Sequence, residues 1–221
     1  MYPQRPKEIS VTALTKLILC GFIKLFFVKL QLNILKKMAR TPSNMVSLGT
    51  KAPDFSLYDV ISEEQKNLNE LKGKNGSVIM FICNHCPYVK HVNKTIVNLA
   101  NKFKNNDINF IAISSNDIIN YPEDSPELMK VNAFENNFIF PYLYDESQEI
   151  AKKYDAACTP DFYLYDQELK LIYRGQLDDS RPGNGIECNG EDLDYAINCL
   201  LSDNENNRIQ KPSIGCNIKW K

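Results

Sequence analysis

FICNHCPYVKH, residues 81–91, places two cysteines and both histidines of the chain within eleven positions. The preceding run SVIMFI, residues 77–82, is short and continuously apolar, which predicts a buried central strand. From residue 89 to residue 103, apolar side chains recur at steps of three and four with lysines between them, which predicts an amphipathic helix. Pro87 stands where a first-turn proline is tolerated. The pair Cys83 and Cys86 therefore forms a C-x-x-C at a strand-to-helix junction.

Patterns on either side of this junction predict an α/β domain. A first strand is expected at 49–60, where turn residues precede apolar alternation. Further along, the sequence predicts a buried strand at 108–114, helices at 125–137, 149–156 and 191–202, and an antiparallel hairpin at 162–176. Strands alternating with helices and ending in a hairpin predict a mixed central sheet with helices on both faces.

Composition places the chain among ordinary globular proteins. It has 221 residues, 43% of them hydrophobic, and a formal charge of −1, so nothing global indicates a nucleic-acid partner. Seven cysteines are too few for a disulfide-stapled secreted scaffold of this length. An odd number leaves at least one thiol unpaired, which favours a reducing, cytoplasmic setting.

The first 37 residues differ from the rest. No acidic residue occurs between Glu8 and Asp54, and the apolar runs are interrupted by Lys24 and Lys29. A membrane-spanning helix needs about 20 mainly apolar residues, so these lysines argue against a span. We interpret residues 1–37 as a basic, apolar leader outside the fold and 38–221 as the domain. A targeting or membrane-surface role, with organellar or membrane contact, applies only if the leader is retained.

The position of the cysteine pair has a chemical consequence. A helix N-terminus presents unpaired N–H groups and a partial positive charge, which stabilise a thiolate and lower its pKa. Cys83 is expected to be the attacking thiolate, and Cys86, one turn on, can close a disulfide with it. His85 lies between them, and its protonated ring is expected to lower the pKa of Cys83 further. This chemistry requires no cofactor.

Two other uses of the pair remain open. A structural zinc ion needs four ligands, and a single C-x-x-C supplies two, so Cys158, Cys216 or His85 would have to complete a metal site. A purely structural disulfide is the second alternative, although it would make no use of the helix terminus. We favour redox exchange over both.

A second signal lies downstream in ACTPDFYLYD, residues 157–166. Proline is tolerated at the start of a strand, and a cis bond between Thr159 and Pro160 is a way to turn the chain there. In a fold of this order, that turn would face the C-x-x-C. Cys158, two residues before Pro160, is then either a small buried hydrophobe or a third redox thiol, and Cys216 in the tail carries the same two readings.

These strings together resemble the thioredoxin fold. APDFSL is similar to the opening segment of its thiol-specific antioxidant and TlpA-like branch. The further strings CNHCP, SSND, FPYLYDE, ACTPDF, YRGQLDDSRPGN and PSIGCNIKWK resemble a group of small thioredoxin-like proteins over residues 38–221. The resemblance implies a thiol-disulfide oxidoreductase in which Cys83 attacks, Cys86 resolves, and Thr159 and Pro160 line a substrate groove. The implied partners are a protein or small-molecule disulfide and a thiol reductant.

The sequence departs from peroxide-reducing relatives at one point. Those proteins carry a threonine or serine three residues before the reactive cysteine, whereas Met80 stands three residues before Cys83. A peroxide-reducing antioxidant is therefore kept as an alternative behind disulfide exchange.

Overall fold

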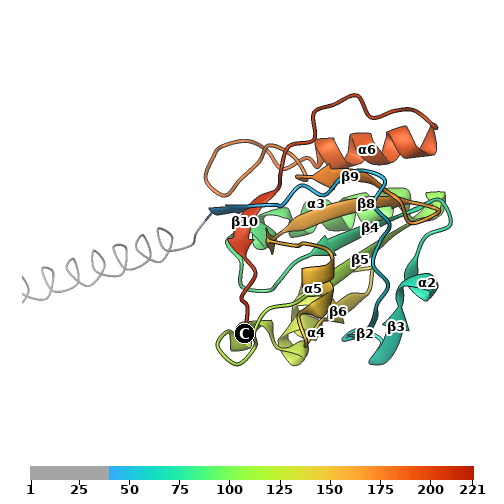
Figure 1. Cartoon of the computed structure of the whole chain (residues 1–221). Coiled ribbons are helices and arrows are strands. Elements are labelled where there is room, and N and C mark those ends of the chain that lie inside the picture. The colour runs from blue at the N-terminus through green and yellow to red at the C-terminus, as the bar shows by residue number, and fades with distance from the viewer. Residues whose placement is uncertain (1–39) are drawn as a thin grey trace, which may run out of the picture. The chain divides into compact units, whose positions relative to one another are not determined.

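The structure, a computed structural model, describes residues 40–221. Its main sheet has seven strands in the order β3-β2-β6-β5-β4-β8-β9 (Figure 1). The strands span β2 (Ser56–Asp59), β3 (Glu64–Asn67), β4 (Gly76–Phe81), β5 (Ile108–Ser114), β6 (Tyr142–Tyr144), β8 (Asp161–Asp166) and β9 (Leu171–Gly175). β4 and β5 pair in parallel at the centre, and β8 joins β4 from the other side in antiparallel.

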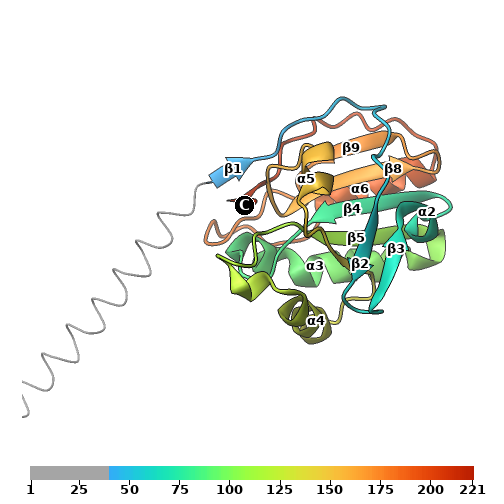
Figure 2. The ribbon, with the colours of Figure 1, turned by 60° about the horizontal axis from the view of Figure 1, so that its bottom comes forward.

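Alternate side chains of the central strands enter two separate cores. Ile79 and Phe81 of β4 point into a cluster that includes Tyr154 and Tyr163 and lies beneath α5 (Glu149–Lys153). The opposite face is covered by α3 (Pro87–Phe103) and α6 (Glu191–Leu201), which lie side by side. Figures 1 and 2 show the helices on both faces. The predicted mixed sheet with two covered faces is confirmed.

The remaining helices are shorter. α2 (Leu68–Leu71) begins with a capping box between Asn67 and Glu70. α4 (Pro126–Glu135) begins at the N-cap Ser125 and packs beside β6. Two turns of 3₁₀ helix, η1 (Lys104–Asn106) and η2 (Pro122–Asp124), complete the set. Among residues 40–221, no helix combines the length and apolar character needed to cross a bilayer.

A second, three-stranded sheet joins distant parts of the chain. β10 (Ile214–Asn217), red in Figure 1, pairs antiparallel with β1 (Arg40–Pro42) and with β7 (Cys158–Thr159). β7 immediately precedes Pro160, so the C-terminal tail lies against the segment that was singled out in the sequence.

Most of the expected elements are found close to their expected bounds. The strand expected at 49–60 is shorter: regular pairing covers only β2, with an isolated bridge between Lys51 and Lys170 ahead of it. The sequence did not predict β1, β3, α2, β6, β7 or β10. The predicted leader, residues 1–37, lies outside the described residues.

Candidate active site

The C-x-x-C lies in the connection between β4 and α3. β4 ends at Phe81, and α3 begins at Pro87 with Cys86 as its N-cap residue. Both cysteines are buried: Cys83 exposes 1% of its surface and Cys86 none. The partial positive charge of the helix N-terminus therefore acts on sulfur atoms that are shielded from water.

The Thr159–Pro160 segment faces both cysteines, as expected. The peptide bond between these residues is cis. The Thr159 hydroxyl lies 3.3 Å from Cys83 Sγ. The Thr159 backbone carbonyl oxygen lies 3.2 Å from Cys86 Sγ and accepts a hydrogen bond from the Cys86 thiol. One residue of β7 thus contacts both members of the dithiol through different atoms. The substrate-groove role of Thr159 and Pro160 stays a prediction.

A third sulfur lies within this cluster. β10 places Cys216 directly opposite Thr159 in the strand register, and its Sγ is 2.7 Å from Cys86 Sγ. Cys216 exposes only 1% of its surface. Cys158 is equally buried, but the contact that the structure gives its thiol is to the Pro160 carbonyl oxygen, at 3.7 Å. Of the two candidate third thiols, Cys216 is the one in sulfur contact with the dithiol.

The pKa values of the dithiol differ from the sequence-based expectation. Burial raises the pKa of Cys83 well above its ordinary value, and its hydrogen bond to Cys86 and the negative charge of Asp124 act in the same direction. Burial also opposes ionisation of Cys86, but hydrogen bonds from the Cys216 and Cys83 side chains outweigh it and lower the pKa of Cys86. The lowered thiol pKa therefore belongs to Cys86 and not, as expected, to Cys83, because the Cys216 and Cys83 side chains stabilise the Cys86 thiolate.

His85 is paired with a carboxylate rather than with Cys83. Its Nδ1 lies 2.6 Å from Asp124 Oδ2, and its ring stacks on Tyr121 at a centroid distance of 5.5 Å. The hydrogen bond to Asp124 raises the pKa of His85 despite partial burial, and the negative charge of Cys86 adds to this effect. The expected effect of His85 on the pKa of Cys83 stays a prediction. The cysteine whose charge contributes to the raised pKa of His85 is Cys86.

Asp124 holds this side of the site together. Its Oδ1 accepts the backbone N–H of Asn84 at 2.7 Å and that of His85 at 3.2 Å, and its Oδ2 accepts the Asn116 side-chain amide at 2.8 Å. Burial raises the pKa of this carboxyl group, but the His85 hydrogen bond and charge outweigh burial and lower it. Sequence reasoning missed Asp124; Asn116 was present only as part of the string SSND, with no role attached.

One group of side chains among the described residues has the geometry of metal ligands. The ligand atoms of Cys83, His85 and Asp124 lie within 4.8 Å of one another. The sequence-based alternative paired Cys83 and Cys86 with Cys158 or His85, so the structure retains Cys83 and His85 and introduces a carboxylate. Both Asp124 oxygens already accept hydrogen bonds, which a bound ion would have to displace in part.

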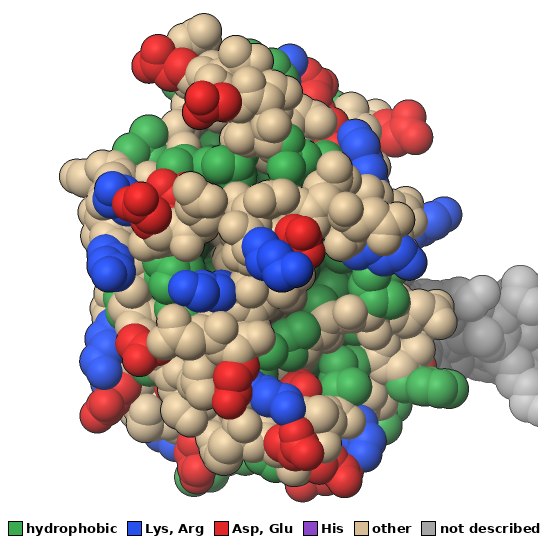
Figure 3. Space-filling view, turned by 90° about the vertical axis from the view of Figure 1, so that its right-hand side faces the viewer, with side chains coloured by type: hydrophobic (Ala, Val, Ile, Leu, Met, Phe, Trp, Pro, Cys, Tyr) green, Lys and Arg blue, Asp and Glu red, His purple; other side chains and the backbone are tan. Residues whose placement is uncertain are grey.

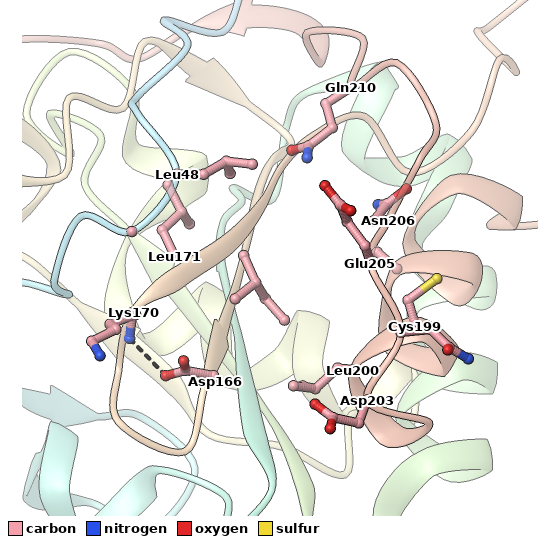
Figure 4. Close-up of a pocket in the computed structure, with 14 residues that line it drawn as sticks. Leu48, Asp166, Lys170, Leu171, Cys199, Leu200, Asp203, Glu205, Asn206 and Gln210 are labelled. Carbon is pink, nitrogen blue, oxygen red and sulfur yellow. Dashed lines mark hydrogen bonds between the residues drawn. The ribbon is translucent and has the colours of Figure 1, made fainter.

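Other parts of the surface are mixed in charge (Figure 3) and include a pocket away from the C-x-x-C. Figure 3 shows acidic and basic side chains interspersed on one face, so no strong field of one sign is visible there. A pocket of about 590 Å³ lies between β9 and α6, lined by residues that include Leu171, Leu200 and Gln210 (Figure 4). Neither cysteine of the C-x-x-C lines it, although Cys199 does.

Comparison with solved structures gives two similar chains over most of the described fold. A conserved protein from Geobacillus kaustophilus is 55% identical, with a TM-score of 0.82, covering 83% of this chain and 97% of its own. A hypothetical protein from Sinorhizobium meliloti is 42% identical, with a TM-score of 0.80, covering 82% and 98%. The search of curated proteins finds no match.

A more distant similarity identifies the fold. The thioredoxin domain of a thiol-disulfide oxidoreductase from Bacteroides vulgatus is 18% identical, with a TM-score of 0.56, covering 71% of this chain and 99% of its own. The predicted thioredoxin fold is confirmed. The AhpC/TSA family matches residues 48–174, a segment that contains the C-x-x-C and the Thr159–Pro160 turn. The chain belongs to the AhpC/TSA family.

Proposed function

We propose that this protein is a thiol-disulfide oxidoreductase whose redox group is the dithiol of Cys83 and Cys86. The observation that carries the proposal is the position of both sulfurs at the start of α3, in contact with Thr159 ahead of the cis proline. Family membership and the thioredoxin fold support redox chemistry in general. The lowered pKa of Cys86 supplies an ionisable thiol beside Cys83.

Cys83 is the attacking thiol, and Cys86 is the resolving thiol. The Cys83 thiol gives up its proton, and its thiolate attacks one sulfur of a substrate disulfide. The substrate disulfide breaks, and the departing sulfur takes up a proton. The Cys86 thiol then gives up its proton, its thiolate attacks Cys83 Sγ, and the bond between Cys83 and the substrate breaks. The second substrate sulfur takes up that proton, so the substrate leaves as a dithiol. The substrate gains two electrons, and the protein keeps a Cys83–Cys86 disulfide.

The reaction sets the partners of the protein. Its substrate is a protein or a small molecule that contains a disulfide, and a cellular thiol reductant returns the dithiol to its reduced state. We propose a reducing, cytoplasmic compartment, because the odd number of cysteines leaves at least one thiol unpaired.

Trapping of mixed disulfides tests the dithiol. Cys86→Ser removes the resolving sulfur, so a substrate captured by Cys83 should remain attached and be recovered on non-reducing gels. Cys83→Ser, with Cys86 intact, is the matched control and should capture nothing. Adducts on Cys83→Ser but not on Cys86→Ser would reverse the two roles, and adducts on neither would reject the proposal.

A metal-binding protein is a second candidate, favoured by the cluster of Cys83, His85 and Asp124. It predicts one tightly held ion per chain after purification in the presence of zinc, lost in Cys83→Ser and in His85→Ala. We rank it second, since the Asp124 oxygens are already occupied by hydrogen bonds. Elemental analysis that finds a stoichiometric ion with this dependence would reverse the ranking.

A further inference from the structure

The C-terminal tail is anchored on both sides of Cys216. Before it, the Ser213 hydroxyl donates to the Pro160 carbonyl oxygen at 2.7 Å. After it, the backbone N–H of Ile218 donates to the Ala157 carbonyl oxygen at 3.1 Å, and that of Lys219 donates to Asn116 Oδ1 at 2.8 Å. Hydrogen bonds on both sides therefore hold Cys216 at one depth and in one register.

The residue before Cys216 allows this close approach. A Cβ atom on Gly215 would lie 2.0 Å from the Thr159 carbonyl oxygen and 2.5 Å from the Thr159 carbonyl carbon. Both are backbone atoms, which cannot yield as a flexible side chain does. A side chain at this position would therefore push β10 away from β7, and with it Cys216 away from Cys86.

Three sulfurs consequently share one buried space. Cys86 Sγ lies 2.7 Å from Cys216 Sγ, and the sulfurs of Cys83 and Cys86 contact the hydroxyl and the carbonyl oxygen of the same residue, Thr159. Disulfides form between cysteines already held this close, provided that the two sulfurs move together by a fraction of an ångström to about 2.05 Å. Cys86 is therefore placed to form a disulfide with either neighbour.

We propose that Cys216 is a third redox thiol that exchanges with the active-site disulfide and produces a Cys86–Cys216 disulfide. This inference rests on the proposed function. The Cys216 thiolate attacks Cys86 Sγ, the bond between Cys86 and Cys83 breaks, and its electron pair leaves with Cys83. The proton released by Cys216 ends on Cys83, and the oxidation level of the protein does not change.

The consequence is a free Cys83 in the oxidised protein. With the disulfide moved to Cys86 and Cys216, Cys83 is a thiol again and can attack a second disulfide before any reductant arrives. In the reduced protein, the hydrogen bond with Cys86, burial and the negative charge of Cys86 all raise the pKa of Cys216, and the positive charge of Lys219 opposes them. Once Cys86 is in a disulfide with Cys83, its charge and its hydrogen bond no longer oppose ionisation of Cys216. The tail is thus part of the redox centre.

Disulfide mapping tests the exchange. The full-length Cys83→Ser variant is treated with oxidised glutathione, digested and analysed by mass spectrometry without reduction. We expect the peptide with Cys86 to be linked to the peptide with Cys216. Cys83→Ser/Cys158→Ser should form the same link, because Cys158 contacts a carbonyl oxygen instead of a sulfur. Cys83→Ser/Cys216→Ser should instead retain glutathione on Cys86.

A second measurement uses the protein with all three sulfurs. After oxidation by two electrons, the wild type should still allow alkylation of Cys83 under denaturing quench, whereas oxidised Cys216→Ser should not. Separate glutathione adducts on Cys86 and Cys216 in the first experiment, or equal Cys83 labelling in the second, would overturn the inference. Capture of substrates by Cys83 in Cys86→Ser would survive that result, so the proposed function and the exchange fail separately.

Discussion

The charges nearest the dithiol come from Asp124 and His85, and they act on different sulfurs. The Asp124 carboxylate contributes to the raised pKa of Cys83. His85 is coupled to the negative charge of Cys86, which contributes to its own raised pKa. The Asp124 carboxylate therefore disfavours the Cys83 thiolate, and the protonated His85 ring favours the Cys86 thiolate.

Removing the charge of Asp124 should lower the pKa of Cys83. Asp124→Asn keeps the size of the side chain and one acceptor oxygen, so the surrounding hydrogen bonds can largely persist. The measurement is the alkylation rate of Cys83 against pH, resolved by mass spectrometry. Asp145→Asn is the matched control, because Asp145 is equally buried but bonds to Ser115 and Ala151. An unchanged profile in Asp124→Asn would show that its charge does not reach Cys83.

The His85–Asp124 pair should make stability depend on pH in a defined window. The folded pKa of His85 is raised above 6.5, so its contribution is complete below that value and is lost as pH rises through the folded pKa. The folded pKa of Asp124 is lowered below 3.8, so its contribution is complete above that value and is lost in acid. The pair therefore stabilises the fold most between these two values.

Urea unfolding of His85→Gln tests this window. The loss in free energy of unfolding relative to wild type should be larger at about pH 5 than at about pH 9, where a smaller fraction of the wild-type ring is protonated. In an Asp124→Asn background, the same substitution should lose most of this pH dependence. A loss of equal size at both pH values would mean that His85 stabilises the fold by stacking on Tyr121 alone.

At the scale of the element, the β8–β9 hairpin carries a buried ion pair directly behind the cis proline. Asp161 opens β8, and Arg174 in β9 contacts both of its carboxylate oxygens, one of them from Nη2 at 2.8 Å. Both side chains are fully buried, and the guanidinium also stacks on Tyr163 at 3.8 Å. The two contacts between the Arg174 guanidinium and the Asp161 carboxylate fix the start of β8, and with it Thr159 and Pro160, which face the dithiol.

Breaking that pair from one side should be costly. Arg174→Met leaves Asp161 buried without its partner, and we expect a loss of about 3–5 kcal/mol in the free energy of unfolding. Arg174→Met/Asp161→Asn should recover part of the loss, since no uncompensated charge remains. Lys170→Met is the control on the same hairpin: its partner Glu168 is exposed, so little change is expected. A small loss in Arg174→Met would show that Asp161 is stabilised by other groups.

Local sequence patterns predicted the strands and helices whose formation depends on residues close together in the sequence. The run at 77–82 and the helical spacing at 89–103 depend on nearest neighbours, and β4 and α3 lie where those patterns place them. β10 has no such pattern, because its four residues are defined by pairing with β7 and β1, which are far away in the sequence. The same long-range pairing hid the contact of Cys216 with Cys86, although Cys216 itself was a candidate.

At the scale of the whole molecule, the dithiol is closed on three sides by parts of the chain that meet only in the folded state. β7 contributes Thr159, the tail contributes Cys216, and the loop after β5 contributes Asp124. Both reactive sulfurs are almost fully shielded from solvent. We therefore expect a substrate disulfide to reach Cys83 Sγ only after one of these three segments moves aside.

The AhpC/TSA family match makes peroxide reduction by Cys83 an activity to test, and the structure places a hydroxyl group beside Cys83 Sγ. Met80, three residues before Cys83, is buried in β4 and has no hydroxyl, but the Thr159 hydroxyl lies 3.3 Å from Cys83 Sγ. We expect hydrogen peroxide to oxidise Cys83 no faster than a small thiol of the same pKa, in stopped-flow experiments on wild type.

Thr159→Val separates a peroxidase from a disulfide oxidoreductase. The variant keeps the shape of the side chain and removes the hydroxyl, which also removes a hydrogen bond that lowers the pKa of Cys83. Rates must therefore be compared at equal thiolate fraction. If Thr159 merely positions Cys83, the variant should slow oxidation by peroxide and by a small disulfide to the same extent. Fast peroxide oxidation in wild type that is lost in Thr159→Val, with disulfide exchange intact, would mean that this hydroxyl replaces the missing one and that the protein reduces peroxides.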